Sequence, residues 1–142
     1  MLFRSGGRLP RTVLYTLNPA DNAVLATLTG SYAEDGVAGK VQFGPAWWYN
    51  DHAAGIRQHL ETLANHGLLS TFIGMTTDSR SLLSMVRHEY FRRVLCGTLG
   101  AWAARGLVPD DFETLVPLVR AVTHGNAQET VLGRRLESGV RN

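Results

Sequence analysis

Asp78 and Arg80 are the residues of this sequence best suited to chemistry, two positions apart in the stretch FIGMTTDSRSLL (residues 72–83). An aspartate at the end of a parallel strand can bind a metal as a hard oxygen ligand or act as a general base. An arginine beside it can hold a carboxylate through its planar guanidinium group. Because Asp78 could equally be only the cap of a following helix, the spacing leaves both roles open.

Trp47 and Trp48 form a second candidate site, in the stretch PAWWYND that directly follows a glycine. Adjacent tryptophans can form the wall of a sugar-binding pocket. The alternative is that one indole packs into the core while the other covers a helix. The sequence alone favours this alternative, because aromatic side chains are usually buried.

The stretch RHEYFRR (residues 87–93) is a third candidate, with three arginines that could bind phosphate. Glu89 and Arg93 are four residues apart, so an exposed helix face with an internal ion pair is the favoured interpretation. The stretch has one histidine and no HExxH pattern, which excludes a zinc protease site. The remaining histidines lack metal-ligand spacing and are expected at the surface or at helix caps: His52, His59, His66 and His124.

Strands alternating with helices must position these residues. Short apolar and β-branched runs predict strands at residues 12–18, 40–44 and 69–75. Capping residues and apolar periodicity predict helices from Asp21 or Asn22 to about 28, from Asp51 to about 65, from Ser79 or Ser81 to about 105, and from Pro109 to about 122. The order β-α-β-α-β-α-α, without a hairpin signal, predicts parallel strands joined by crossover helices. In such folds the loops after the carboxyl ends of the strands carry the function.

Composition narrows the class of protein. The 142 residues are 44% hydrophobic with a formal net charge of +2, and this basic excess is too small to predict a nucleic-acid partner. No apolar run approaches the roughly 18 residues of a membrane span, and no signal peptide precedes the first strand, so we expect a cytoplasmic protein. The single cysteine, Cys96, excludes an internal disulfide framework and is expected to be a buried thiol.

Three long stretches resemble one known family: LYTLNPADNAVLATLTG, GVAGKVQFGPAWWYNDH and LLSTFIGMTTDSRSLLSMVRHEYFRRVLC, followed by a weaker GNAQ. They are similar to the C-terminal part of uronate isomerase (glucuronate isomerase), a member of the amidohydrolase superfamily. WWYND, TDSRS and RHEYFRR at their mutual spacings make the resemblance specific. It divides the chain into an unmatched N-terminal segment (residues 1–11), a C-terminal barrel part (residues 12–128) and a polar tail (residues 129–142).

The resemblance implies an α/β fold that forms the C-terminal part of a (β/α)8 barrel, about three βα units with terminal helices. A complete barrel takes about 250 residues, so we expect a fragment that is inactive alone. The resemblance also implies the activity of the parent enzyme. That enzyme interconverts D-glucuronate and D-fructuronate, or D-galacturonate and D-tagaturonate, by proton transfer between C1 and C2 through an enediol. One alternative is a non-catalytic remnant that associates with another subunit, and a second is a hydrolase of the same superfamily.

The site residues follow from the matched motifs. Asp78 corresponds to the aspartate that the family uses as a metal ligand and acid/base, and Arg80 to its substrate-binding arginine. Trp47 corresponds to the active-site tryptophan, and we expect Trp48 to contact substrate as well. The resemblance implies one divalent metal, zinc, whose other ligands include a His-x-His pair that this sequence lacks. The expected partners are a small uronate substrate and, for the parent enzyme, further copies of itself.

Overall fold

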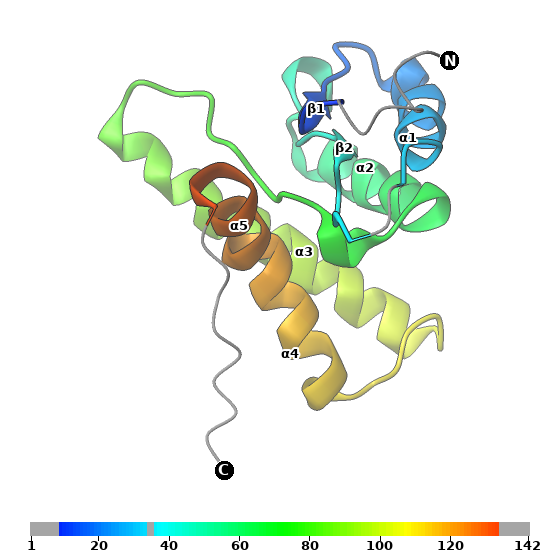
Figure 1. Cartoon of the computed structure of the whole chain (residues 1–142). Helices are drawn as coiled ribbons and strands as arrows, with labels where there is room; N and C mark the ends of the chain where they lie inside the picture. Colours follow the sequence, from blue (N-terminus) through cyan, green and yellow to red (C-terminus); the bar gives the residue numbers. More distant parts are fainter. Residues whose placement is uncertain (1–8, 34–35, 134–142) are drawn as a thin grey trace.

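A computed structural model describes residues 9–33 and 36–133, so most of the predicted segments 1–11 and 129–142 lie outside the described residues. Helices predominate over a small sheet (Figure 1). The elements are β1 (Thr12–Leu14), η2 (Pro19–Asp21), α1 (Asn22–Gly30), β2 (Val41–Phe43), η3 (Trp48–Asn50), α2 (Ala53–His66), η4 (Leu69–Thr71), η5 (Leu82–Met85), α3 (Val86–Ala104), α4 (Phe112–Arg120), η6 (Ala121–Gly125) and α5 (Asn126–Leu132). The η elements are 3-10 turns, except η6, which is a π-helical turn.

The sheet has two parallel strands joined by a crossover helix. Thr12 pairs with Val41 and Leu14 with Phe43, and α1 connects the two strands. α1 packs against β2 and α2, and α2 in turn packs against α3. The predicted α/β arrangement with parallel strands is confirmed, and it matches part of a barrel rather than a closed one.

The third predicted strand, residues 69–75, is wrong. The segment begins with the 3-10 turn η4 and continues as extended chain that pairs with neither β1 nor β2. Its backbone groups are occupied by side chains instead. The N–H of Ile73 donates to Oε1 of Gln42 over 2.9 Å. Nδ2 of Asn126 donates to the carbonyl oxygens of Ser70 and Phe72, at 2.7 and 2.8 Å.

The same segment nevertheless supplies the centre of the core. Leu69, Phe72 and Ile73 are buried among side chains of the surrounding helices. Those helical residues are Ile56, Leu60, Phe91, Val94, Leu95, Leu99, Trp102 and Val122. The apolar character that predicted a strand is therefore explained by burial, since Leu, Ile and Phe are among the residues most often buried in any conformation.

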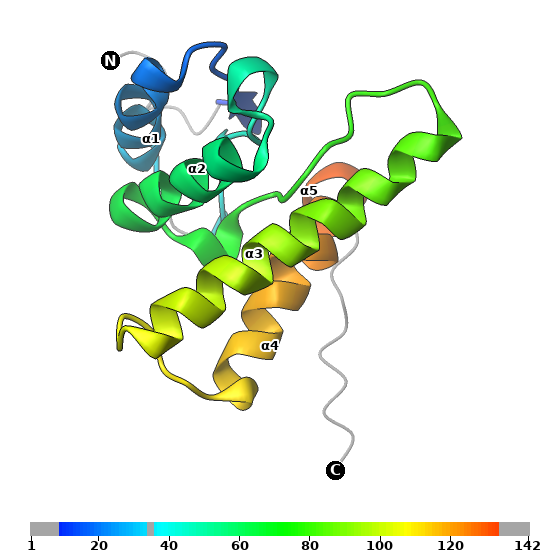
Figure 2. The ribbon, with the colours of Figure 1, turned by 180° about the vertical axis from the view of Figure 1, so that it is seen from behind.

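The helix predicted from Ser79 or Ser81 begins as a 3-10 turn, η5, and becomes α-helical at Val86. The apolar periodicity predicts a buried stripe that begins with Leu82, Leu83, Val86 and Tyr90. This part of the prediction is wrong, because all four side chains are exposed. Burial starts only at Phe91, and Figure 2 shows the N-terminal end of α3 projecting beyond the other helices. This end therefore leaves an exposed apolar surface.

Other boundaries are mixed. Asp111 caps α4 through hydrogen bonds from the N–H groups of Glu113 and Thr114, which confirms the predicted helix start. α2 is capped by His52, not by Asp51 as predicted. Cys96 is exposed, so the predicted buried thiol is wrong; it follows the buried Leu95 but lies outside the buried stripe of α3. Within the described ranges, every helix is too short or too polar to cross a bilayer.

Gly74 gives a test of how the extended segment packs. Its φ is 88°, and a Cβ there would lie 2.1 Å from the Val122 carbonyl oxygen. We expect Gly74→Ala to lower the free energy of unfolding by about 2 kcal/mol or more, from strain and overpacking together. Gly97→Ala is the matched control, because open space surrounds that helical glycine, and it should stabilise by about 0.5 kcal/mol. Urea unfolding of both variants measures this, and equal effects would contradict the packing described.

Candidate active site

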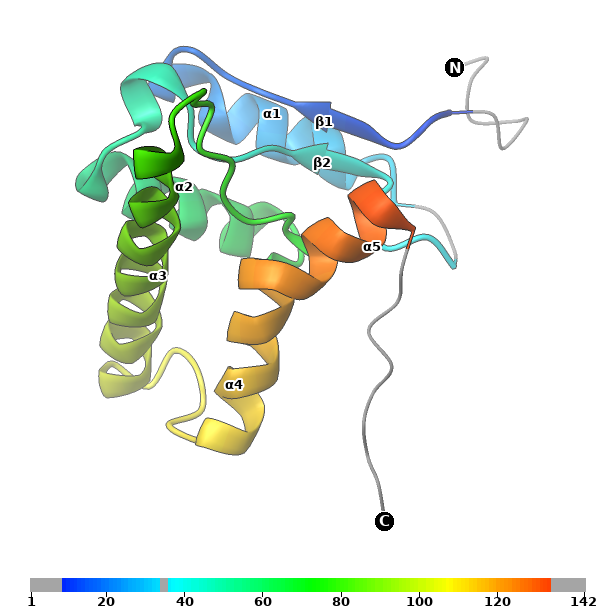
Figure 3. The ribbon, with the colours of Figure 1, turned by 90° about the vertical axis from the view of Figure 1, so that its left-hand side faces the viewer.

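Trp47 and Asp78, both predicted site residues, meet near the carboxyl ends of the strands. Nε1 of Trp47 donates a hydrogen bond to Oδ2 of Asp78 over 2.7 Å. Trp47 lies in the loop that follows β2, and Asp78 in the loop that precedes η5; Figure 3 shows these loops side by side at one end of the sheet. The hydrogen bond fixes the orientation of the carboxylate relative to the indole.

Asp78 and Trp48 have left-handed backbones. Their φ values are 47° and 49°, which residues other than glycine seldom adopt. Such conformations cluster at active sites and ligand clamps, where the surrounding structure enforces them. Both loops that meet at the Trp47–Asp78 hydrogen bond therefore carry a residue whose backbone conformation is unfavourable by itself.

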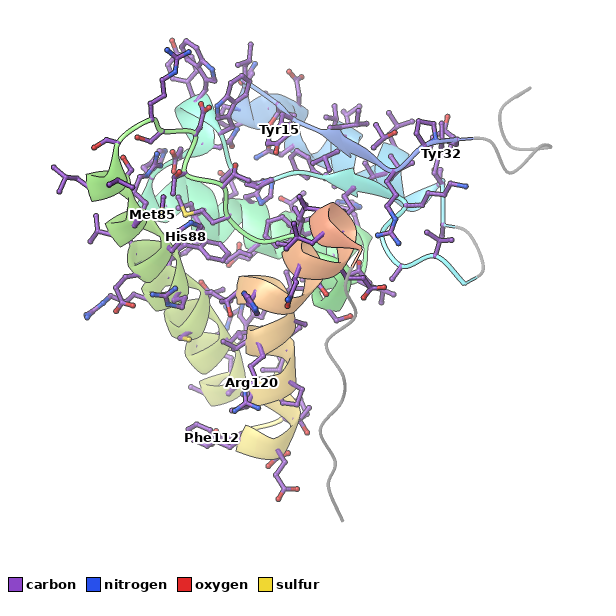
Figure 4. The ribbon with its side chains drawn as sticks, turned by 60° about the vertical axis from the view of Figure 1, so that its left-hand side comes forward. Tyr15, Tyr32, Met85, His88, Phe112 and Arg120 are labelled. Atoms are coloured by element: carbon purple, nitrogen blue, oxygen red, sulfur yellow. The ribbon has the colours of Figure 1, made fainter. Side chains whose placement is uncertain are left out.

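The aromatic side chains of this end are stacked edge to face. Tyr15, which follows β1, lies 5.8 Å from Trp47 between ring centroids, and Trp48 lies 5.9 Å from Trp47 at an interplanar angle of 86°. Figure 4 shows Tyr15 by the sheet, Tyr32 at the opposite end of the strands, and Met85 and His88 at the start of α3. Trp47 is half-buried between its neighbours, whereas Trp48 is exposed, so neither indole belongs to the core.

Arg80 is exposed and makes no hydrogen bond or ion pair with another residue of the described ranges. The structure therefore does not join it to Asp78. Its guanidinium group remains free to bind an anionic ligand by two parallel hydrogen bonds.

Arg87 connects the two loops, a role that the sequence pattern did not predict. Its guanidinium pairs with Oδ2 of Asp51 and donates from Nη1 to the Thr77 carbonyl oxygen over 2.9 Å. The predicted pair of Glu89 and Arg93 on the outer face of the same helix is confirmed at 2.9 Å. Hydrogen bonds from Arg92 and then Arg93 lower the pKa of Glu89. Arg87, which binds the two loops, and Arg93, which pairs at the surface, thus lie six residues apart on one helix.

A closed ring of buried polar side chains joins the loop after β1 to the loop after β2. Thr16 donates to Oδ1 of Asn22 over 2.7 Å, Asn22 donates to Oδ1 of Asn50 over 2.8 Å, and Asn50 donates to Thr16 over 3.3 Å. Each side chain donates one hydrogen bond and accepts one within the ring, so the three residues are linked to one another. Asn22 and Asn50 both follow predicted strands, and loops that follow parallel strands lie at the same end of the sheet. The sequence therefore indicated that these two residues could meet.

His59 is buried and not at the surface, so that prediction was wrong. Its ring packs against Phe43 at 4.4 Å and Phe72 at 5.7 Å between centroids. Burial lowers its pKa to about 4, and a hydrogen bond to the backbone of Gly44 acts in the opposite direction. The signal was present in the sequence, since residue 59 lies between Ile56 and Leu60 on the buried side of the helix.

Asp78 is the one candidate metal ligand among the predicted site residues. Within the described ranges, no group of three His, Cys, Asp or Glu side chains could hold a metal ion. Asp78 is an exposed carboxylate with one oxygen bound by Trp47, which fits a single oxygen ligand of a shared site. A cavity of about 600 Å³ lies at the other end of the strands beside Thr29, Lys40 and His66, and none of the predicted site residues lines it.

The buried His59 predicts a pH dependence of stability. Its folded pKa of about 4 is below the ordinary 6.5, so the unfolded chain binds the proton first as the pH falls. Stability is full above pH 6.5 and is lost as the pH falls towards 4, by roughly 3 kcal/mol in total. Urea unfolding between pH 7 and 4.5 should show this slope in the native chain and a flatter slope in His59→Gln. The slope should persist in His66→Gln, at the exposed end of the same helix; an unchanged slope in His59→Gln would contradict the assignment.

Comparison with known proteins identifies relatives of this chain. The sequence matches the glucuronate isomerase family over residues 2–131. A uronate isomerase of Caldanaerobacter subterraneus subsp. tengcongensis is 55% identical over 123 residues, which are 87% of this chain and 26% of the relative. A uronate isomerase of Salmonella arizonae is 57% identical over 120 residues, which are 84% of this chain and 26% of the relative.

A solved structure gives the same result. The crystal structure of uronate isomerase from Thermotoga maritima superimposes with a TM-score of 0.75 at 34% identity, over 84% of this chain and 25% of that one. The present chain therefore spans about a quarter of the length of the relatives it matches.

Proposed function

This chain belongs to the glucuronate isomerase family, and we propose that it supplies the Asp78 segment of the active site in an aldose–ketose isomerase of uronates. The reactions are those of D-glucuronate with D-fructuronate and of D-galacturonate with D-tagaturonate. The observation that carries the proposal is the hydrogen bond from Trp47 to Asp78, because it joins two separate family motifs, WWYND and TDSRS, at one point.

The proposed roles follow from the chemistry of each side chain. Trp47 donates to one carboxylate oxygen of Asp78 and thereby presents the other oxygen in a fixed direction. Asp78 exchanges a proton with the substrate as C1 and C2 interconvert through an enediol. Arg80, exposed and without a partner among residues 9–33 and 36–133, holds the substrate carboxylate and stabilises the negative charge that develops on the enediol oxygens. Trp48, exposed beside Trp47, covers one face of the sugar.

A divalent metal fits this site only if Asp78 shares its coordination with residues from elsewhere. Asp78 would supply one oxygen ligand, and the remaining ligands would come from outside the described residues. Zinc held in this way would polarise the oxygens of the substrate as a Lewis acid. The residues of this chain act independently of that contribution, by orienting the carboxylate and binding the anionic end of the uronate.

A second candidate function is association with another polypeptide without catalysis. The exposed apolar surface at the start of α3 favours it, since Leu82 and Leu83 are 87% and 86% exposed and Met85 is 52% exposed. Both functions are compatible if the partner carries the remainder of the barrel.

We expect the 142-residue chain alone to leave D-glucuronate unchanged, because a quarter of the relatives' length supplies too few groups to enclose and bind the substrate. The measurement is an assay for ketose formation with added zinc, and with manganese in a parallel sample. Turnover above the rate of a sample without protein would contradict the expectation.

A chimera tests the positive part of the proposal. Residues 9–132 of this chain would replace the matching segment of the Caldanaerobacter uronate isomerase, and the purified chimera should isomerise D-glucuronate. Asp78→Asn should then lower kcat about a thousandfold or more, and Arg80→Lys should raise KM about tenfold. Asp110→Asn, an exposed aspartate before α4, is the matched control and should leave both constants unchanged.

Two results of this experiment would contradict the proposal. One is a folded chimera without isomerase activity. The other is a chimera in which Asp78→Asn and Asp110→Asn behave alike, because then the Asp78 carboxylate would have no special role.

A further inference from the structure

Two buried polar atoms beneath the site have no hydrogen-bond partner among the described residues. They are Nε2 of His59 and Oδ1 of Asp51. Both residues line the same small cavity, together with Ile56, Met75 and Phe91. An unsatisfied buried polar atom costs about 1–3 kcal/mol, so two of them at one cavity indicate that a further group binds there.

The cavity is the size of one water molecule. Its volume is about 10 Å³, measured as the space open to the centre of a water molecule. A buried water requires roughly 10–15 Å³ on this measure and at least two polar partners. Any larger ligand is excluded by size. A metal ion is excluded by the ligand set, since His59 and Asp51 would give it two protein ligands and no third such group is close by in the described ranges.

Both atoms are hydrogen-bond acceptors, so the group that binds them must donate two hydrogen bonds. The hydrogen bond between the His59 ring and the Gly44 backbone raises the pKa of His59. A bond that favours the protonated ring is one in which the ring N–H donates, so the acceptor is the Gly44 carbonyl oxygen. Because Nε2 has no such bond, Nδ1 is the donor and Nε2 of the neutral ring is an acceptor. The free carboxylate oxygen of Asp51 is an acceptor too. Two acceptors cannot bond to each other, whereas water can donate one hydrogen to each.

We propose that one water molecule is bound between Nε2 of His59 and Oδ1 of Asp51, and that His59 acts through it as a positioning residue for the loop that carries Trp47. His59 then holds both ends of this loop. It binds Gly44 directly at the start of the loop and Asp51 through the water at its end.

The water also completes the fixation of Asp51. Oδ2 of Asp51 is bound by Arg87, and the same arginine binds the Thr77 carbonyl oxygen next to Asp78. With Oδ1 bound by the water, the carboxylate is fixed at both oxygens. The connection therefore runs from His59 through the water, Asp51 and Arg87 to the backbone beside Asp78.

The first measurement uses the native 142-residue chain and does not depend on the isomerase proposal. Nitrogen-15 NMR of the imidazole at pH 7 should show Nδ1 protonated and Nε2 unprotonated in His59. Water-selective NOE and ROE spectra should show a cross-peak of the sign of a long-lived water at the His59 ring. A protonated Nε2, or a His59 ring without such a cross-peak, would overturn the proposal whatever the variants do.

Variants then test the positioning role. His59→Leu removes both hydrogen bonds at nearly constant volume, and His59→Gln retains a group that can donate to Gly44 and accept from water. We expect the indole N–H of Trp47 to exchange with solvent about tenfold faster in His59→Leu and at most about threefold faster in His59→Gln. The indole N–H of Trp102, in the core, should keep its rate in both.

The comparison of the two indoles separates positioning from general loss of stability. If Trp47 and Trp102 speed up by the same factor in His59→Leu, the histidine only stabilises the core and the positioning role is wrong. If Trp47 keeps its native rate, the role is wrong as well. Should His59→Leu fail to fold, Asp51→Leu takes its place, with loss of the water cross-peak at His59 expected and its persistence contradicting the shared site.

Discussion

The position of Arg87 is the constraint on which the arrangement of this end of the molecule depends. Its guanidinium binds a carboxylate from the loop after β2 and a backbone carbonyl from the loop before η5, two segments with no strand pairing between them. The pair with Asp51 is partly shielded, with the side chains 32% and 19% exposed, so it is worth more than a surface ion pair. The planar donor fork of arginine suits this double contact, and lysine could not reproduce it.

Polar contacts fix the loops at the carboxyl ends of the strands, because the apolar core does not extend to them. The core lies between α2, α3 and the extended segment 72–75, and the loops above it carry half-exposed aromatic side chains. Where burial contributes little, orientation must come from directional bonds. The ring of Thr16, Asn22 and Asn50 and the bonds of Arg87 supply these directional contacts.

The sequence predicted the features that depend on local pattern. Both observed strands, the start of α4 after its cap Asp111, and the Glu89–Arg93 pair follow from periodicity, capping chemistry and spacing. α1 begins at the predicted place, but Asp21 makes no capping hydrogen bond there. The proximity of Trp47 and Asp78, 31 positions apart, was expected from the rule that loops after parallel strands form one site and from the motifs of the family, since no local pattern relates residues so distant. The third strand could not be judged from its own residues, since Gln42 and Asn126, distant in sequence, occupy its backbone groups. The burial of His59 differs, because it follows from the position of the residue on the apolar stripe of α2 with Ile56 and Leu60 and not from its polar side chain.

The strain at residue 78 shows why contacts far from the substrate matter here. A left-handed aspartate costs about 1–2 kcal/mol, and the exposed hydrogen bond from Trp47 contributes about 1 kcal/mol. That bond alone therefore does no more than balance the strain. The additional bond from Arg87 to the carbonyl of the preceding residue is needed to make the conformation dominant. Since Arg87 is itself oriented by Asp51, the direction of the Asp78 carboxylate is decided in part beneath the site, on the residues that fix Asp51.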